Sequence, residues 1–495
     1  MQAAKEEKKN VTEKLVFHAF KYKGKAYLFD IRTLVSLRID EAAYEALKLF
    51  NDYSKDQILE KLKGRFSEST IQEVFLGIEQ LKKQGLFRPA MEETPEEIDA
   101  HIKRVVNRES ASIQLALVKG CNMRCEYCYE KDCFNKDGNI LMSKEVGERA
   151  VEFLIEKSKH CKGMNITFFG GEPLINWKTI KHLVHYIEKR AKELGRGSPY
   201  YALTTNGTLI TKEIARYIKK YNFGLMCSLD GPPEIQNKLR PMAGGKGSFY
   251  KAARGIKRVM KIRRQVTVRA TTNKANNDCL MLHEFFERFG FTRFAIGAAM
   301  GKSFSKGPLD FGPEDVDALI EKADKEIDFA LQRLKEGKPL YRNPFTVLKA
   351  IHTRKHTKIR CGVGKGTTIV SVDGKLFPCH RYLGMDEYCV GDIWKGYDKQ
   401  KLYDYLYDYI KIKDTCKPCW LRTLCGGPCP WYVAHEDGHH RSPDEDFQCR
   451  IVKSSYERAI WLYEEVKEKY PDYFEKLTSA AEETAKKETK ARKYY

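Results

Sequence analysis

The sequence contains 495 residues, 42% of them hydrophobic and 31% charged, which is enough for about three domains with substantial cores. No run of about 18 apolar residues is present, which argues against a helical membrane span. The first residues, MQAAKEEKKNVTEK, lack the apolar stretch of a secretory signal. These features predict a cytoplasmic enzyme without membrane attachment.

The formal net charge is +21. Such a strongly positive charge is typical of proteins that bind nucleic acid. However, the basic residues are mixed with acidic ones in helix-like runs such as KEVGERAVEFLIEKSKH, and many others lie in the tail AKKETKARKYY. No recognition motif for RNA or DNA occurs. We therefore do not expect nucleic acid as a partner.

The chain has fifteen cysteines. In a long chain rich in lysine and glutamate, so many cysteines indicate metal clusters rather than a disulfide framework. This use of cysteine requires a reducing compartment and favours an oxygen-poor niche.

The first unit begins with residues 15–40, LVFHAFKYKGKAYLFDIRTLVSLRID, which place Val, Phe, Tyr and Ile at alternating positions. The alternation predicts a β-meander. Three helical patterns follow, for which Asp40, Ser54 and Ser67 are suitable N-caps. We interpret residues 1–90 as a small winged-helix-like domain.

Three cysteines in the run CNMRCEYCY, namely Cys121, Cys125 and Cys128, follow a buried-strand pattern at residues 113–118. Thiolates at this C-x3-C-x2-C spacing can hold one iron–sulfur cube and leave its fourth iron without a protein ligand. A zinc site is the alternative, but zinc-binding loops prefer C-x2-C pairs with a suitably spaced fourth ligand, which we do not find here. The motif therefore favours an iron–sulfur cluster.

Apolar strand patterns that end in polar or glycine residues recur after the cysteine loop. The first, NITFFGGEPLI, ends in Gly170, Gly171 and Glu172, where glycines allow close approach to the backbone and a carboxylate can accept from an ammonium group. Barrel and open α/β sheets bind ligands at the carboxyl ends of their strands, so these patterns predict one shared site. The other patterns are residues 201–207, 224–231, 266–273 and 294–300.

The cysteine loop and the GGEP sequence together resemble the radical SAM superfamily. The resemblance implies an α/β fold with a partial (β/α)6 barrel over residues 110–310, and a 4Fe-4S cluster whose open iron chelates S-adenosylmethionine (SAM). It implies that Glu172 and its glycines hold the methionine amino group, that Ser228 and Arg240 contact the SAM carboxylate or ribose, and that Tyr127 lies beside the adenine. A purely structural role is an equal alternative for Arg240. The cofactor-binding candidates are Tyr127, Gly170, Gly171, Glu172, Asn206, Ser228 and Arg240.

The C-terminal third carries a second group of cysteines, which resembles the SPASM extension of radical SAM peptide-modifying enzymes. The resemblance implies two auxiliary 4Fe-4S clusters, and hence three clusters in the whole protein. One auxiliary cluster would be held by Cys416, Cys419, Cys425 and Cys449. The other would be held by Cys361, Cys379 and Cys429.

Two closed cubes would need eight thiolates, and the array supplies seven. Sulfatase-maturing relatives have an additional cysteine shortly after the first, where this chain reads GVGKGTT with Thr367. Cys389 is a candidate for the missing ligand, but it lies outside the pattern. We therefore interpret the Cys361 cluster as having one open iron, which a substrate thiolate can bind. The other cysteines are expected to be core residues or to have no special role: Cys133, Cys161, Cys227 and Cys279.

The whole layout is similar to the clostridial maturases of SCIFF peptides, a cysteine-rich class of thioether-crosslinked ribosomal peptides. The resemblance implies cleavage of SAM to a 5′-deoxyadenosyl radical, hydrogen abstraction from a substrate residue, and C–S bonding to a cluster-bound cysteine. The implied partners are a Cys-rich precursor peptide and an electron donor such as ferredoxin or flavodoxin. The N-terminal domain would bind the leader of the peptide as an added strand.

Two alternatives remain open. An anaerobic sulfatase maturase forms formylglycine, but such enzymes usually have Asp directly after the second SPASM cysteine, where this chain has His380, and they lack the N-terminal recognition domain. A basic winged-helix protein with redox-sensing clusters would bind DNA, but it would leave GGEP without a role. The expected units are a recognition domain (1–90), a linker (91–109), the barrel (110–310), a helical connector (311–350), the SPASM domain (351–455), and a C-terminal helix with a basic tail (456–495).

Overall fold

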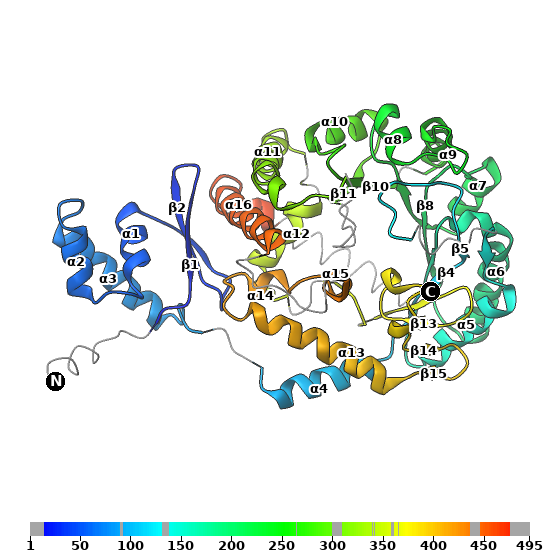
Figure 1. Ribbon diagram of the computed structural model, residues 1–495, viewed down its shortest axis with the longest axis horizontal. Coiled ribbons are helices and arrows are strands. Elements are labelled where there is room, and N and C mark those ends of the chain that lie inside the picture. The colour runs from blue at the N-terminus through cyan, green and yellow to red at the C-terminus, as the bar shows by residue number, and fades with distance from the viewer. Residues whose placement is uncertain are drawn as a thin grey trace.

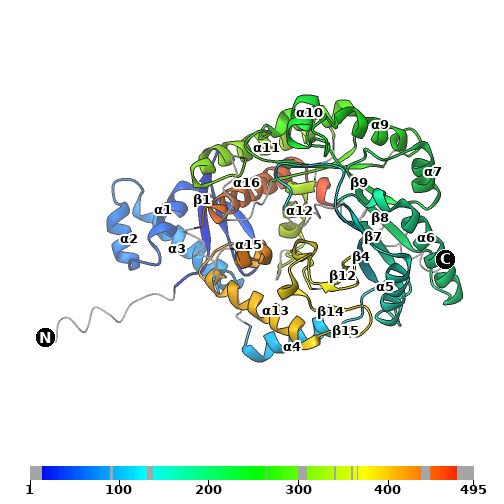
Figure 2. The same cartoon turned by 45° about the vertical axis from the view of Figure 1, so that its right-hand side comes forward.

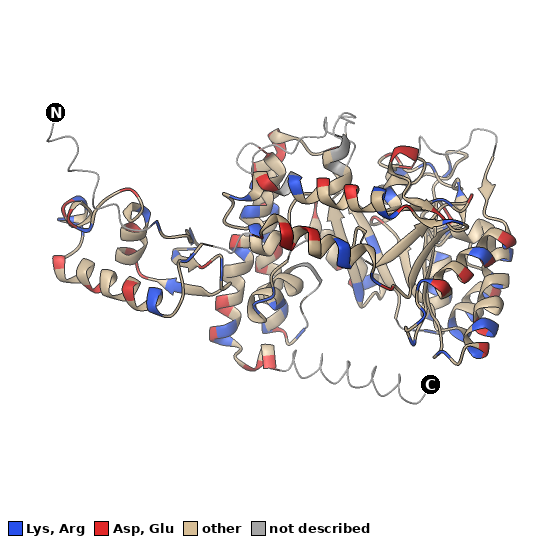
Figure 3. Cartoon of the chain, turned by 90° about the horizontal axis from the view of Figure 1, so that it is seen from below, with Lys and Arg blue, Asp and Glu red and all other residues tan. Residues whose placement is uncertain are grey.

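The computed structural model describes residues 14–89, 93–130, 138–263, 265–298, 309–338, 340, 342–357, 361–364, 366–435 and 446–475. A small N-terminal lobe lies to one side of a larger body, in which the barrel and the C-terminal elements surround a central region (Figures 1 and 2). Lys and Arg alternate with Asp and Glu along the helices (Figure 3). Within the described ranges, no helix has both the length and the apolar character that a membrane crossing requires.

The body is organised by an eight-stranded sheet of order β11-β10-β9-β8-β7-β4-β12-β13. Its first six strands are mutually parallel, which confirms the predicted partial (β/α)6 barrel. A parallel arrangement brings the carboxyl ends of these strands to one edge, as the strand patterns required. The six strands are β4 (Ser112–Ala116), β7 (Asn165–Phe169), β8 (Tyr200–Thr205), β9 (Gly224–Ser228), β10 (Thr267–Thr272) and β11 (Arg293–Ala298).

Burial alternates along these strands, with Ile166 and Phe168 of β7 fully buried and Thr167 only half-buried. Because successive side chains of a strand point to opposite faces, one face packs against the helices and the other lines the barrel interior. The helices of the outer layer are α5 (Lys144–Glu156), α6 (Trp177–Glu193), α7 (Lys212–Lys220), α8 (Pro233–Leu239), α9 (Phe249–Met260) and α10 (Cys279–Phe289). The interior face is thus left for a ligand.

The C-terminal region continues the barrel sheet instead of forming a separate layer. Strand β12 (Thr367–Val370) pairs parallel to β4, and β13 (Leu376–Phe377) pairs antiparallel to β12. The segment that follows Val370 therefore leaves the sheet at the same edge as the cysteine loop. The remaining elements are β14 (Gly391–Asp392), β15 (Gly396–Tyr397), α13 (Lys399–Ile412), α14 (Arg422–Cys425), α15 (Pro430–His435) and α16 (Phe447–Lys469).

The N-terminal lobe is a three-stranded antiparallel sheet followed by three helices. The side chains of Asp40, Ser54 and Ser67 accept from the first-turn backbone amides of these helices, so the predicted N-caps are confirmed. The elements are β1 (His18–Tyr22), β2 (Lys25–Phe29), β3 (Ser36–Ile39), α1 (Glu41–Leu49), α2 (Lys55–Leu62) and α3 (Glu68–Lys83). Helix α4 (Pro95–Val106) then leads to the barrel and packs against α13.

One face of the N-terminal sheet packs against the C-terminal helices. Phe20, Tyr27 and Phe29 share a hydrophobic cluster with residues of α16 and of the connector helices α11 (Val316–Lys335) and α12 (Arg342–His352). Polar contacts surround this cluster, for example the Tyr22 hydroxyl that donates to Asp324 and the His18 ring that lies 2.8 Å from Glu457 Oε1. The expected boundary between the SPASM domain and the C-terminal helix, at residues 455 and 456, lies inside α16. The helix is continuous there, and its second half packs against the N-terminal sheet.

We expect an isolated fragment of residues 1–90 to associate or aggregate, because cutting the chain exposes Phe20, Tyr27 and Phe29, which are at most 5% exposed in the full chain. Each such side chain contributes on the order of 1.5–3 kcal/mol when buried. Light scattering and binding of a hydrophobic dye would measure the effect. A fragment with Tyr27→Thr and Phe29→Thr serves as the control and should stay monomeric. A monodisperse wild-type fragment that binds no dye would contradict the shared core.

Candidate active site

The three cysteines of the loop after β4 lie together and half-buried. The pKa of the thiols of Cys121 and Cys128 is raised to about 12, mainly by burial and then by the charges of Glu172 at Cys121, of Glu130 at Cys128 and of Cys125 at both. The loop is fixed from outside by two backbone bonds, from Arg124 N to Pro241 O (2.8 Å) and from Glu126 N to Leu239 O (3.1 Å). The segment after α8 therefore holds the loop over the carboxyl edge of the sheet.

Glycines 170 and 171 are required by the close approach of this loop to β7. A Cβ atom on Gly171 would lie 2.0 Å from the carbonyl oxygen of Gly120, and one on Gly170, whose φ is +124°, would lie 2.8 Å from Val118 O. Both positions exclude any larger residue. The sequence predicted glycine here for approach of a ligand, whereas in the structure the neighbour is the protein backbone beside Cys121.

The carboxylate of Glu172 is buried and accepts hydrogen bonds from within the protein. Oε1 accepts from Leu174 N (3.0 Å) and Thr205 Oγ1 (2.8 Å), and Oε2 accepts from Asn206 N (2.7 Å). Burial raises the pKa of Glu172 to about 7 against the opposing effect of these donors. Glu172 thus joins the ends of β7 and β8, and its contact with an ammonium group stays a prediction.

Asn206 extends this connection to the cysteine loop. Its Nδ2 donates to Asn122 Oδ1 (2.8 Å) and lies 3.8 Å from the sulfur of Cys121. An amide directed at a cluster ligand is the type of outer contact that tunes iron–sulfur sites. The structure therefore places Asn206, a sequence candidate, beside the first cysteine.

Tyr127 and Arg240 meet on Asp230, which the sequence analysis did not single out. Arg240 Nε donates to Asp230 Oδ2 at 3.0 Å, the Tyr127 hydroxyl donates to the same oxygen, and Thr271 N donates to Oδ1 at 3.0 Å. Asp230 is fully buried and Arg240 is 9% exposed. Its place in the SLDG sequence could have identified Asp230 as the partner of Arg240, because a buried arginine needs a carboxylate beside it.

Ser228 ends β9, is half-buried, and is paired in the sheet with Arg269 of β10. By the alternation of β9 it belongs to the same face of the sheet as Met226, between the buried Leu225 and Cys227. Ser228 thus lies on the barrel interior two residues before Asp230. The predicted SAM candidates at strand ends, Glu172, Asn206 and Ser228, are brought to one edge.

The seven cysteines of the C-terminal array fall into two groups by their mutual electrostatic effects. The pKa of Cys379 is raised to about 11, chiefly by burial. The charges of Cys429 and Cys361 also raise it. The pKa of Cys449 is raised above the usual range by burial and by the charges of Asp446 and three thiols, namely Cys425, Cys416 and Cys419. These influences link Cys379 to Cys429 and Cys361, and Cys449 to the other three thiols, while the roles of the seven cysteines as cluster ligands stay a prediction.

In the described ranges, no group of three or more His, Cys, Asp or Glu side chains converges as the ligands of a single metal ion would. An iron–sulfur cube makes a different demand, because each thiolate binds a separate iron and the ligands surround the cube. Clustered cysteines without acidic or histidine co-ligands thus fit a cube better than a mononuclear site.

The thiol of Cys389 is directed at Gly391 O at 3.2 Å. Cys389 shares one small apolar cluster with Cys379 and Cys429, but the thiols that raise the pKa of Cys379 are those of Cys429 and Cys361. Cys227 and Cys279 are buried as expected, and Cys161 is half-buried near Glu109. Cys133 lies outside the described residues.

His380 connects the barrel with the array at the position where the sequence analysis noted the absence of Asp. Its ring centroid lies 5.0 Å from that of Phe169 at the end of β7 and 6.0 Å from that of Tyr129 after the cysteine loop. Burial lowers the pKa of His380 to about 4, so the ring is neutral at physiological pH. The guanidinium of the neighbouring Arg381 lies over the rings of Tyr129 and Trp431 and so joins the cysteine loop to the C-terminal array.

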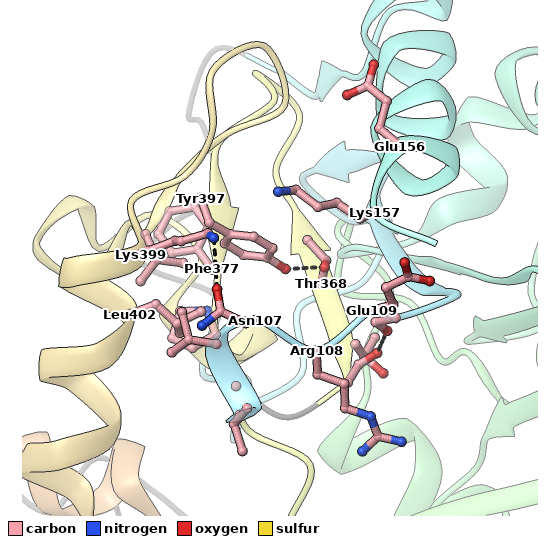
Figure 4. A pocket seen from close by; sticks show the side chains of 18 residues that line it. Asn107, Arg108, Glu109, Glu156, Lys157, Thr368, Phe377, Tyr397, Lys399 and Leu402 are labelled. Atoms are coloured by element: carbon pink, nitrogen blue, oxygen red, sulfur yellow. Dashed lines mark hydrogen bonds between the residues drawn. The ribbon is translucent and has the colours of Figure 1, made fainter. Parts of the chain in front are cut away.

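A cavity of about 310 Å³ opens at this junction. Its lining comes from the end of β4, the cysteine loop and the turn after β12, and includes Ala116, Glu130, Gly170, Ser371 and Lys375. A second cavity of about 150 Å³ lies at the opposite edge, near the starts of β4 and β12, and is lined by Ser110 and Thr367 among others (Figure 4). The larger cavity lies at the carboxyl edge of the barrel sheet, as the loop with the three cysteines does. It is the candidate substrate site.

The family model of the radical SAM superfamily matches residues 115–280. A serine-type anaerobic sulfatase-maturating enzyme of Bacteroides thetaiotaomicron is 31% identical over 63% of this chain and 80% of its own length. This chain belongs to the radical SAM superfamily. The predicted superfamily and its SAM chemistry are thereby confirmed at this level.

Other relatives match this chain at lower sequence identity. A cysteine-type anaerobic sulfatase-maturating enzyme of Clostridium novyi is 24% identical over 69% of this chain and 92% of its own length. The radical SAM cyclopropyl synthase TigE of Paramaledivibacter caminithermalis is 28% identical over 56% of this chain and 60% of its own length. A solved structure of native anSMEcpe with bound AdoMet and Kp18Cys peptide superimposes with a TM-score of 0.62 at 21% identity, covering 72% of this chain and 98% of that one. That likeness shows the shared fold.

Proposed function

We propose that this radical SAM protein closes intramolecular thioether crosslinks in a ribosomally made, Cys-rich precursor peptide. A peptide substrate is supported by the maturase names of its relatives and by the peptide bound in the similar solved structure. The alignment with the Clostridium novyi maturase leaves about a third of this chain unmatched, which agrees with an additional recognition domain.

Cys121, Cys125 and Cys128 would hold the cluster that binds SAM, with Asn206 directed at the Cys121 sulfur. When bound, this cluster and SAM supply a carbon radical that takes a hydrogen atom from the substrate. Glu172 positions the ends of β7 and β8, and Asp230 orients Tyr127 and Arg240 beside the loop. His380, Tyr129 and Trp431 exclude water where the barrel meets the array.

The observation that carries the thioether proposal is the group of Cys361, Cys379 and Cys429, with Cys389 directed to the Gly391 carbonyl instead. Three thiols would leave one position of a 4Fe-4S cluster free for the sulfur of a substrate cysteine. Thiolate is a much softer ligand than an alcohol, so this position selects cysteine over serine. Cys416, Cys419, Cys425 and Cys449 would hold a closed cluster.

The leader of the peptide would bind to the N-terminal lobe. Within the described residues β3 pairs only with β2, so its other edge carries backbone groups that an extended peptide can use. The lobe is fixed on α16 through Phe20, Tyr27 and Phe29, so a bound leader is held at a defined place relative to the array.

Mass spectrometry of the product tests the proposal. With the Cys-rich peptide usually encoded beside such enzymes as substrate, each crosslink should lower the peptide mass by about 2 Da, because one C–S bond replaces a C–H and an S–H bond. The crosslinks should resist thiol reductants, unlike disulfides, and a Cys-to-Ser peptide should give none. Loss of an auxiliary cluster in Cys389→Ala would mean that the protein closes the Cys361 cluster, and substrate sulfur binding would then be rejected.

Formylglycine formation, the activity expected of a sulfatase maturase, is the second candidate, because two relatives are named as anaerobic sulfatase-maturating enzymes. Formylglycine contains an aldehyde that hydrazine reagents label, whereas a thioether does not react. A hydrazine-reactive product would replace the thioether proposal with this one. His380 argues against it, since a buried neutral imidazole differs in charge from the aspartate usual at that position.

A further inference from the structure

Three segments that are distant in the sequence meet at α14, the short helix that ends in Cys425. Thr423 joins them, because its carbonyl oxygen accepts from Thr357 N (2.8 Å) and its hydroxyl donates to Ile31 O (2.7 Å). In Figure 1, α14 accordingly lies beside the N-terminal sheet. Each segment contributes cationic side chains next to these contacts. We call this group, Arg32, Lys355, Lys417 and Arg422, the basic junction.

The positive charge of the basic junction is only slightly compensated. Lys355 and Lys417 are exposed, and Lys417 pairs with the exposed Asp414 at 3.1 Å. Asp30 is buried beside Arg32, but its oxygens accept from Thr33 and from Phe87 N. The Arg422 guanidinium donates to the Lys417 carbonyl. Among the described residues no carboxylate forms an ion pair with Arg32, Lys355 or Arg422.

The basic junction adjoins the thiols assigned to the closed auxiliary cluster. Lys417 follows Cys416 directly, Arg422 N donates to Cys419 O at 3.2 Å, and Thr423 precedes Cys425 by two residues. Cys419 and Cys425 are half-buried rather than fully enclosed. A protein that docks on these cations therefore comes close to this cluster.

We propose that the basic junction is the docking surface for an acidic one-electron carrier protein, which collects the electron released by crosslinking. The inference rests on the proposed function, because closing a thioether is a two-electron oxidation of the peptide and leaves one electron to remove. Complementary charge accelerates and orients the encounter of such partners more than it adds affinity. A surface with an excess of positive charge beside a redox group is suited to this kind of transient contact.

The electron count of the reaction requires such an acceptor. Forming one thioether removes two hydrogens from the peptide. The C–H hydrogen leaves as an atom and ends in 5′-deoxyadenosine, whereas the S–H hydrogen leaves as a proton to solvent. One electron is therefore left over when the C–S bond closes, and one electron was consumed when SAM was cleaved. A single carrier that gives one electron and later receives one balances each turnover.

The test compares two double charge reversals in the holoenzyme, with a purified acidic ferredoxin as the probe. Lys355→Glu with Lys417→Glu alters the basic junction. Lys189→Glu with Lys220→Glu alters exposed cations of α6 and α7, on the far side of the body in Figures 1 and 2. Both variants lower the net charge of +21 by the same amount. We expect the first to weaken ferredoxin affinity at low salt by about tenfold or more and to flatten its salt dependence, and the second to change affinity by less than about twofold.

Iron content and turnover with a small chemical reductant should be unchanged in both variants, since neither touches a thiol. If the reversal disturbs folding, the neutral pair Lys355→Gln with Lys417→Gln should still weaken ferredoxin binding, by a smaller factor. Equal affinity of wild type and junction variant would overturn the proposal, as would tighter binding of a transfer RNA than of ferredoxin at the same salt. Weaker ferredoxin binding without any thioether product would reject the proposed reaction and retain the docking surface.

Discussion

Replacing Cys121, Cys125 and Cys128 together with alanine is expected to abolish SAM cleavage while leaving the auxiliary clusters in place. The three thiols lie on one loop, where the charges of Cys125 and Cys128 both raise the pKa of Cys121. Without them SAM loses the iron that delivers the electron, so the loss should be complete. Bound iron should fall by about a third, since one of three cubes is removed.

Iron analysis and quantification of 5′-deoxyadenosine measure the two effects separately. Cys161→Ala is the matched control, because this half-buried thiol lies near Glu109, at the opposite edge of the barrel from the cysteine loop. It should leave both values unchanged. Undiminished 5′-deoxyadenosine in the triple variant would reject the assignment of this loop to SAM chemistry.

Asp230→Asn is expected to destabilise the barrel by about 3–5 kcal/mol, the usual cost of removing one partner from a buried ion pair. The substitution keeps the shape of the side chain but leaves the guanidinium of Arg240, which is 9% exposed, without a compensating charge. Tyr127 loses the charged acceptor of its hydroxyl at the same time. SAM binding should weaken together with stability.

The midpoint of denaturant unfolding, followed by a signal from the barrel, measures the loss. Glu321→Gln is the control, because the Lys325–Glu321 pair is 2.8 Å long but more than half exposed, and surface pairs contribute about 0–1 kcal/mol. An unchanged midpoint in Asp230→Asn would mean that Arg240 does not depend on this carboxylate.

The barrel was predictable because each of its strands carries its own local signal. An apolar run followed by glycine or polar residues marks β7, β8 and β9, and parallel pairing follows from the intervening helices. The N-caps Asp40, Ser54 and Ser67 are equally local. Pairing of β12 with β4 was not predictable, because it joins residues about 250 positions apart and leaves no local trace.

The site was predictable where chemistry fixes the residue type and not where packing does. Cysteine spacing drew attention to both groups of cysteines, because thiolates are the usual ligands of the clusters that we predict there. In contrast, Asp230 and His380 matter because they contact Arg240 and Phe169, and only the folded structure brings these residues together. Glu172 was predicted to meet a ligand, and its three internal donors became visible only with the neighbouring strand in place.

Helix α16 has a consequence for engineering. The same helix starts beside Cys449 and then supplies Glu457, Glu464 and Glu465 to His18, Ser36 and Lys25 of the N-terminal sheet. An N-terminal lobe transplanted from another radical SAM protein would therefore meet an unmatched surface unless this part of α16 were transplanted with it. Under the leader binding that we propose, redesigning the free edge of β3 is a simpler route to new peptide specificity than exchanging whole lobes.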